Sequence, residues 1–213
     1  MPEPARPPRR DAARNRSALI EAGRCAFAQH GLGAALEPIA AEAGVGIATL
    51  YRHFPSRTEL WEAVLAEPLA QIEALVQRAL AVADPWQAFA GYLHEVCAAE
   101  ASADGMVALM TTRFDGAPGL LATRARIQQG AEQLFQRAQD AGAIRTDASP
   151  TDLAFIMLAN DRIVERLGTV APDAWRRALD LALDGLRTPD PHPLGAAALK
   201  PNQIWRALMR GTR

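Results

Sequence analysis

Residues 39–60 read IAAEAGVGIATLYRHFPSRTEL, a stretch that predicts two short helices joined by a turn. The first helix is expected over 36–43 and the second over 47–54, where a proline follows and stops it. Gly44 lies between them and can adopt the positive φ that such a turn requires. Two short helices around a glycine turn are typical of a helix-turn-helix, whose second helix enters the major groove of DNA.

The apolar residues of this stretch support the same interpretation. Ile39, Ala40 and Val45 are close in sequence and are expected to pack the first helix against the second. Ser56 is a favourable N-cap for the next helix, with Glu59 at the capping-box position three residues later. The pattern therefore predicts a compact helical unit that leaves the second helix free to contact a partner.

The stretch also resembles the DNA-binding signature of the TetR family, which has the form I-A-x-x-A-G-V-x-x-x-T-L-Y-x-H-F-x-[ST]-[KR]-x-x-L. The preceding helix is similar to the family's first helix through Leu19, Ala22, Phe27 and Gly31. The resemblance covers roughly residues 14–62 without a gap. Beyond it, only the helical character and the length of the chain are similar to the family.

The resemblance implies roles for particular residues. Thr49, Tyr51 and His53 match positions that hold phosphates, as does Arg57 at the start of the next helix, where the helix dipole adds to its charge. Ile47 and Ala48 match positions that face base edges, while Leu50 and Phe54 match core positions. The expected DNA-binding set is Gly46, Ile47, Ala48, Thr49, Tyr51, Arg52, His53 and Arg57.

Two positions depart from the family pattern. Gly46 stands where serine is common, a small loss because glycine caps a helix nearly as well. Ala35 stands where threonine or serine commonly caps the second helix and touches a phosphate. One phosphate contact is therefore expected to be missing, which leaves the operator sequence open but not the expectation of DNA binding.

The whole chain is expected to be all-α, with about nine to ten helices: an N-terminal three-helix helix-turn-helix domain and a C-terminal helical ligand-binding and dimerisation domain. Proline, glycine and aspartate separate the helical segments, and no stretch predicts a strand. The expected domains are a disordered basic arm over 1–11, the DNA-binding domain over 12–56, the helical domain over 57–188, and a linker with a short amphipathic segment over 189–213.

Bulky apolar residues gather in the C-terminal half, where the resemblance implies a ligand cavity. Aromatic and methionine side chains suit such a pocket, although most of them also suit a plain core. The candidate pocket residues are Trp86, Phe89, Leu93, His94, Met106, Met110, Arg113, Phe114, Phe135 and Phe155, with Asp104 as a further polar candidate. His94 and Cys97 have helical i, i+3 spacing, but one histidine and one cysteine do not complete a tetrahedral metal site. No metal and no cofactor are therefore expected.

The last two long helices, expected over 150–167 and 172–186, are candidates for a dimer interface. Their apolar stripes are wide enough to require cover. The candidate interface residues are Leu153, Ile156, Met157, Asn160, Ile163, Val164, Leu179, Leu183 and Leu186. A symmetric homodimer would read a roughly palindromic site.

Charge is distributed unevenly along the chain, although the net charge is only −1. Residues 1–60 hold eight arginines and six acidic residues, while the remainder is net acidic. Such an asymmetry suits a protein that presents one end to phosphates, but on charge alone a solvated tail is an equal alternative. Two cysteines, no apolar run of membrane-spanning length and no signal peptide predict a cytoplasmic protein.

These features favour a ligand-responsive repressor that binds double-stranded operator DNA as a homodimer, responds to an unidentified small-molecule effector and has no membrane partner. An enzyme or lipid carrier with a vestigial helix-turn-helix is one alternative, but no catalytic motif is recognisable. An architectural DNA-binding protein is another, but a pI near 6.4 is low for that class.

Overall fold

The computed structural model describes residues 8–102, 116–187, 191–200 and 202–203. Within these ranges it contains eight α-helices and one 3-10 turn, and no strand. The predicted all-α class is confirmed, with a helix count slightly below the expected nine to ten. Residues 105–115, where the sequence predicts a further helix, and nearly all of the amphipathic segment after residue 200 lie outside the described residues.

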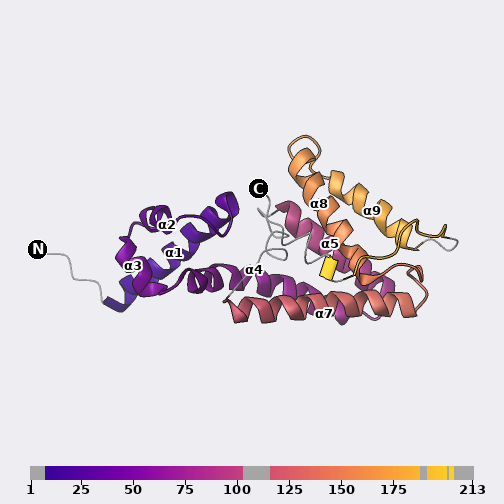
Figure 1. The fold of residues 1–213 in the computed structure, drawn as a ribbon, viewed down its shortest axis with the longest axis horizontal. Coiled ribbons are helices and arrows are strands. Elements are labelled where there is room, and N and C mark those ends of the chain that lie inside the picture. Colours follow the sequence, from indigo (N-terminus) through magenta and orange to yellow (C-terminus); the bar gives the residue numbers. More distant parts are fainter. Residues whose placement is uncertain (1–7, 103–115, 188–190, 201, 204–213) are drawn as a thin grey trace, which may run out of the picture. The chain divides into compact units, whose positions relative to one another are not determined.

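The chain forms two compact units, one of the described residues up to Glu67 with 116–121, and one of the rest. Figure 1 labels the helices of the first unit, which are α1 (Pro8–His30), α2 (Leu36–Glu42), α3 (Ile47–His53) and the beginning of α4 (Arg57–Leu80). α1 begins at Pro8, ahead of the expected start near Ala12. Proline is well tolerated at the first helical position, because the missing N–H would have no partner there.

The core of the first unit is built largely from residues of the signature-like stretch and of the helix before it. Leu19, Ile39, Leu50, Phe54 and Leu60 are each at most 2% exposed. α1 packs on α2, and α2 on α3. Gly23 and Val64 are in close contact where α1 meets α4, since a Cβ at Gly23 would lie 2.9 Å from Val64 Cγ2.

The second unit contains the remainder of α4 with α5 (Pro85–Ser102), α7 (Pro118–Asp140, from residue 122 on), the 3-10 turn η1 (Pro150–Asp152), α8 (Leu153–Leu167) and α9 (Ala174–Arg187). α8 and α9 pack side by side, and both contact α5 (Figure 1). Phe89 of α5 and Phe135 of α7 are fully buried and meet edge to face, with ring centroids 5.8 Å apart.

Side-chain caps precede α4, α5 and the 3-10 turn ahead of α8, and the first of them is the cap predicted at Ser56. The Glu59 amide donates to Ser56 Oγ at the start of α4. The Gln87 amide donates to Asp84 Oδ1 at the start of α5. A full capping box joins Ser149 and Asp152 ahead of α8. α4 continues through Pro68, which directly follows the boundary between the two units. None of the described helices combines the length and apolar content needed to cross a bilayer.

Candidate functional site

The turn between α2 and α3 fixes how α3 leaves the first unit. The Val45 amide donates to the Ala40 carbonyl at 2.9 Å and the Gly44 amide to the Ala41 carbonyl at 3.0 Å. Together these bonds form a Schellman motif, which requires a left-handed residue after the helix. Gly44 takes that conformation with φ +70°. The predicted role of this glycine is therefore confirmed.

α3 divides into a buried side and an exposed side. Leu50 is fully buried and the following Phe54 is 2% exposed, so both anchor the helix to the core. Ala48, Tyr51 and Arg52 share the opposite face at helical spacing and are exposed. Of the other expected DNA-binding residues, Gly46 is the extended N-cap of α3, and Ile47, Thr49, His53 and Arg57 are partly exposed.

Arg57 has partners within the protein that the sequence did not predict. Its Nη1 donates to the carbonyls of Leu32 and Ala34, in the loop between α1 and α2. Trp61, one turn later on α4, donates through Nε1 to the same Leu32 carbonyl at 3.2 Å. The two side chains thereby hold the loop that leads into the helix-turn-helix. Sequence reasoning missed Trp61, because nothing in the local pattern indicates which carbonyls approach it.

The N-terminal helix also reaches the end of α3. The Arg16 guanidinium lies 5.2 Å from the centroid of the Phe54 ring, a cation–π distance. Arg14, by contrast, is exposed, and its Nη2 lies 3.5 Å from Oδ1 of Asp11 on the same helix. Both arginines belong to α1, so the basic charge of this region is carried at least partly by an ordered helix.

The candidate ligand-pocket residues that the structure describes divide between the core and the surface of the second unit, and the rings of Trp86 and Phe89 are in contact, with centroids 6.0 Å apart. Phe89, Leu93 and Phe135 are buried in the core of the second unit. Trp86 is partly exposed, with the Arg187 guanidinium 5.0 Å from its ring centroid. His94 Nε2 lies 3.2 Å from Asp180 Oδ1 on α9, and Phe155 is 51% exposed. Met106, Met110, Arg113 and Phe114, together with Asp104, lie outside the described residues.

The candidate dimer residues divide between two faces of α8 and α9. Asn160, Leu179 and Leu183 are at most 5% exposed, because their own chain covers them and leaves little of their surface for a partner. They face inward because their apolar stripe packs within the second unit. The partly exposed members are Leu153, Ile156, Met157, Ile163, Val164 and Leu186.

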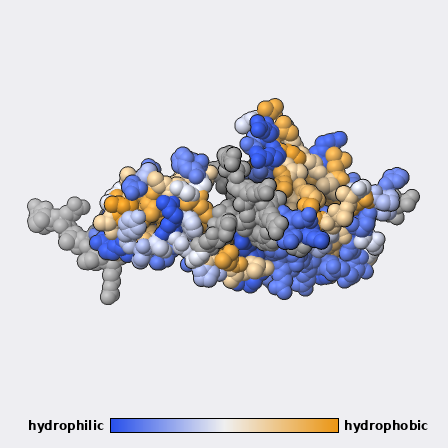
Figure 2. Space-filling model, viewed as in Figure 1, coloured by the Kyte–Doolittle hydropathy of each residue, from blue (hydrophilic) through white to orange (hydrophobic). Residues whose placement is uncertain are grey.

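A different set of apolar side chains is exposed around α8 and α9. Figure 2 shows hydrophobic surface over this part of the second unit. The exposed residues are Phe155 at 51%, Leu158 at 41%, Leu167 at 43%, Val170 at 83% and Leu181 at 64%. Leu167 lies on the apolar stripe expected for the dimer and Phe155 is a candidate pocket residue, whereas Leu158, Val170 and Leu181 belong to neither predicted set.

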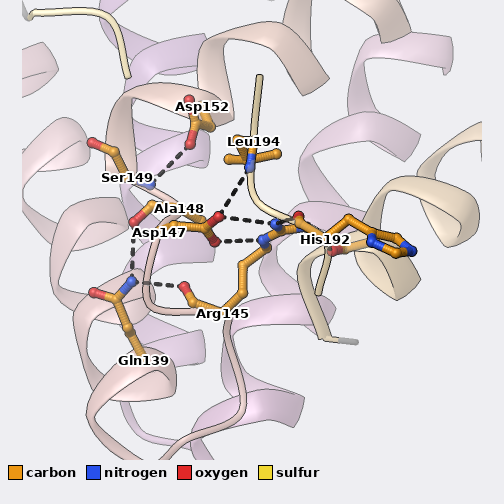
Figure 3. Close-up of polar contacts among 9 residues, drawn as sticks. Gln139, Arg145, Asp147, Ala148, Ser149, Asp152, His192 and Leu194 are labelled. Carbon is orange, nitrogen blue, oxygen red and sulfur yellow. Dashed lines mark hydrogen bonds and ion pairs between the residues drawn. The ribbon is translucent and has the colours of Figure 1, made fainter. Parts of the chain in front are cut away.

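Residues 192 and 194, which follow α9, form hydrogen bonds with the loop between α7 and η1, as Figure 3 shows. Arg145 forms two hydrogen bonds with the Asp147 carboxylate and donates a third to the His192 carbonyl. Asp147 Oδ2 in turn accepts the amide of Leu194 at 3.2 Å. The hydrogen bonds from Arg145 hold the pKa of the Asp147 carboxyl at about 2.

Comparisons with known proteins agree with this arrangement. A family model described as "Bacterial regulatory proteins, tetR family" matches residues 19–64. A second, described as "Transcriptional regulator SbtR-like, C-terminal domain", matches residues 84–188. No match was found among curated protein sequences.

Solved structures of TetR regulators are similar to this chain over most of its length. One from Streptomyces coelicolor is 34% identical and covers 82% of this chain and 99% of its own, with a TM-score of 0.50. The ketosteroid regulator KstR2 of Mycobacterium tuberculosis is 22% identical, covers 81% and 95%, and has a TM-score of 0.63. PfmR from Thermus thermophilus is 19% identical, covers 80% and 99%, and also has a TM-score of 0.63. The last two similarities concern the fold alone.

Proposed function

The chain belongs to the TetR family of bacterial transcriptional regulators, and from this premise we propose that it represses transcription as a homodimer on a palindromic operator. A small, largely apolar effector releases it from the DNA. The proposed site of action is the cytoplasm, where the operator is accessible.

The observation that carries the DNA-binding half of the proposal is the exposed face of α3. Ala48, Tyr51 and Arg52 lie on it, and Leu50 on the other side is fully buried. An α-helix with its side chains is roughly 10–12 Å across, which fits a major groove roughly 12 Å wide. The Ala48 methyl suits contact with a thymine methyl, while the Tyr51 hydroxyl and the Arg52 guanidinium suit phosphates.

Arg57 has two roles in this proposal. Its Nη1 fixes the loop before α2 through two carbonyls. A guanidinium carries five N–H donors, so Nε and Nη2 remain for a phosphate. The residue thus supports the position of the helix-turn-helix in the free protein and contacts the backbone of the operator in the complex.

The dimer half of the proposal rests on exposed apolar side chains. Phe155 and Leu158 on α8 and Leu181 on α9 are all more than 40% exposed. An apolar surface on neighbouring helices favours cover by a second copy of the same surface, which gives a twofold interface. Two helix-turn-helix domains related by this twofold axis contact two half-sites that together form a palindrome.

α4 is the proposed transmitter of the effector signal. It contributes residues to both compact units, and Pro68 stands at the boundary between them. Proline leaves one carbonyl of the preceding turn without its helical donor, so the helix is easier to bend there. An effector that binds one conformation of the second unit more tightly shifts the population of the DNA-binding conformation accordingly.

The decisive experiment is a selection of random duplex DNA on the purified full chain at two salt concentrations. Enrichment of a palindrome is expected, and it supplies the operator probe for an effector screen. Binding without enrichment would instead favour an architectural role, and no binding at all would contradict the proposal.

Variants in the helix-turn-helix then separate the contacts. Arg57→Ala should weaken binding to all sequences and reduce the slope of log K against log salt by about 1 for each phosphate that a subunit no longer holds. Tyr51→Phe, which removes an uncharged hydroxyl, should also weaken binding to all sequences but leave the slope unchanged. Ala48→Leu should change the enriched sequence instead. Arg78→Ala, an exposed arginine of the second unit, is the matched control and should leave the slope unchanged. An unchanged slope for Arg57→Ala would contradict a phosphate contact by Arg57, whose role would then be limited to its hydrogen bonds with the loop before α2.

A further inference from the structure

The N-terminal part of α1 carries an exposed arginine at the end of α3. The Arg16 guanidinium lies 5.2 Å from the centroid of the Phe54 ring, and Phe54 is the C-cap residue of α3. Phe54 is only 2% exposed, whereas Arg16 is exposed. The positive charge is therefore held on the outside of the first unit, next to the helix that is proposed to enter the major groove.

Arg16 differs from the neighbouring arginines in how its charge is paired. Arg14 and Arg24 of α1 each lie 3.5 Å from a carboxylate, and Arg57 donates to two backbone carbonyls. Among the residues that the structure describes, Arg16 has neither a hydrogen bond nor an ion pair, and its contact is the Phe54 ring. A guanidinium stacked on a ring keeps its five N–H donors at its edge. These donors and the uncompensated charge are available to a partner outside the chain.

The position of Arg16 beside α3 indicates which part of DNA it can reach. The exposed face of α3 carries Ala48, Tyr51 and Arg52, and Arg16 approaches the helix from the side of its buried Phe54. A helix in the major groove occupies roughly the width of that groove, so a side chain beside the helix meets the wall of the groove. The wall consists of the sugar–phosphate backbone, and arginine binds phosphate through two parallel N–H groups. A phosphate is therefore favoured over a base edge.

We propose that Arg16 binds a phosphate of the operator backbone at the C-terminal end of α3, once in each subunit of the dimer. The inference deepens the proposed function and rests on it for one point, namely that α3 enters the groove. Arg16 precedes residues 19–64, which match the family model, and it is not among the residues that the resemblance assigns to DNA. Ala35 at the N-cap of α2 has no side-chain donor for a phosphate. Arg16 supplies a phosphate contact from a different helix.

The size of the effect follows from the release of counterions. Each phosphate contact contributes about 0.9 to the slope of log K against log salt, so a dimer that loses two contacts loses about 2. Arg16→Gln removes the charge and keeps a side chain that favours a helix. Between about 50 and 200 mM salt, the advantage in affinity of the unmodified chain over Arg16→Gln should therefore shrink roughly tenfold.

The test measures the affinity of the full chain for two labelled duplexes over a series of salt concentrations. One duplex contains the palindrome enriched from random DNA, and the other has the same base composition in scrambled order. Arg16→Gln should weaken both duplexes alike and leave the ratio of the two affinities unchanged, because a phosphate carries no sequence information. Arg24→Gln is the matched control, since it removes the same charge from an exposed position of α1 and should leave the slope unchanged.

Arg16→Lys separates a phosphate contact from a purely structural role of the stack on Phe54. Lysine keeps the positive charge but has no planar group to stack on the ring. The slope of the unmodified chain should therefore persist in Arg16→Lys. The proposal is overturned if Arg16→Lys loses as much slope as Arg16→Gln, if Arg16→Gln keeps the slope, or if Arg24→Gln loses it equally.

A measurement on the unmodified chain keeps the proposal testable even if Arg16→Gln does not fold. Phenylglyoxal modifies exposed arginines, and mass spectrometry of the peptides gives the rate at each position. The bound palindrome should slow the modification of Arg16 at least threefold and leave the rate at Arg24 unchanged. An unchanged rate at Arg16 contradicts the phosphate contact.

Failure of this contact and failure of the proposed function have different signatures. If neither duplex binds, the proposed function fails and the contact with it. If the palindrome binds tightly while the slope and the modification rate do not depend on Arg16, the operator-binding function holds. Arg16 then only stacks on Phe54, and this inference is wrong.

Discussion

Replacing Gly130 by alanine tests how closely α4 and α7 approach each other. A Cβ built at Gly130 would lie 2.1 Å from Val76 Cγ1. Carbon atoms pack at roughly 3.5–4.0 Å, so the contact must open by about 1.5 Å. Val76 is fully buried, and as a β-branched residue in a helix it strongly prefers one χ1 rotamer. Overpacking of this kind costs about 3 kcal/mol, the upper part of the usual range.

Helix propensity opposes this cost, because alanine is about 1 kcal/mol better than glycine inside a helix. The net expectation for Gly130→Ala is therefore a loss of about 2 kcal/mol in the free energy of unfolding. In a Val76→Ala background the nearest remaining atoms are the Cβ of residue 76 at 3.5 Å and Leu80 Cδ1 at 3.8 Å, both ordinary contacts. There the same substitution should stabilise by up to about 1 kcal/mol.

Urea unfolding followed by helical circular dichroism, at one fixed protein concentration, measures these differences. Gly91→Ala is the matched control, since Gly91 lies inside α5 with nothing within 4 Å of its Cβ position. It should stabilise by about 0.5–1 kcal/mol. If Gly130→Ala stabilises as much as Gly91→Ala, or if Val76→Ala leaves its effect unchanged, the close approach of the two helices is wrong.

Two further predictions concern the second unit. Leu181→Glu places a charge on the proposed dimer face and should give monomers in sedimentation at micromolar concentration. The control is Val82→Glu, which changes an exposed apolar residue outside α8 and α9 and should leave the dimer intact. A dimeric Leu181→Glu protein would contradict the interface. The hydrogen bonds from Arg145 lower the pKa of Asp147 to about 2, below its ordinary 3.8. These bonds therefore stabilise the folded chain fully at pH values above 3.8, and this stabilisation is lost as the pH falls through 2. Asp147→Asn should remove this part of the acid dependence and speed exchange of the Leu194 amide; unchanged exchange would mean that Asp147 does not hold this segment.

The local signals in the sequence predicted the fold class and the helix-turn-helix. Each depends on interactions between residues a few positions apart: Gly44 in its turn, Ser56 with Glu59 at a cap, and Leu50 with Phe54 on one side of α3. Short-range chemistry of this kind is much the same wherever the helix finally lies. The DNA-contact residues follow from it through their resemblance to a known family and stay a prediction.

The tertiary structure alone decided what covers each apolar stripe. A helical period identifies residues that share a face, but it does not say whether that face meets the same chain, a second copy or a ligand. Asn160 and Leu179 share the stripes expected for the dimer yet lie inside the chain, while Phe155, expected in the pocket, is exposed. Likewise, the partners of Arg57 lie more than twenty residues away in the sequence. Such contacts depend on how helices pack in three dimensions, and no local pattern in the sequence encodes that.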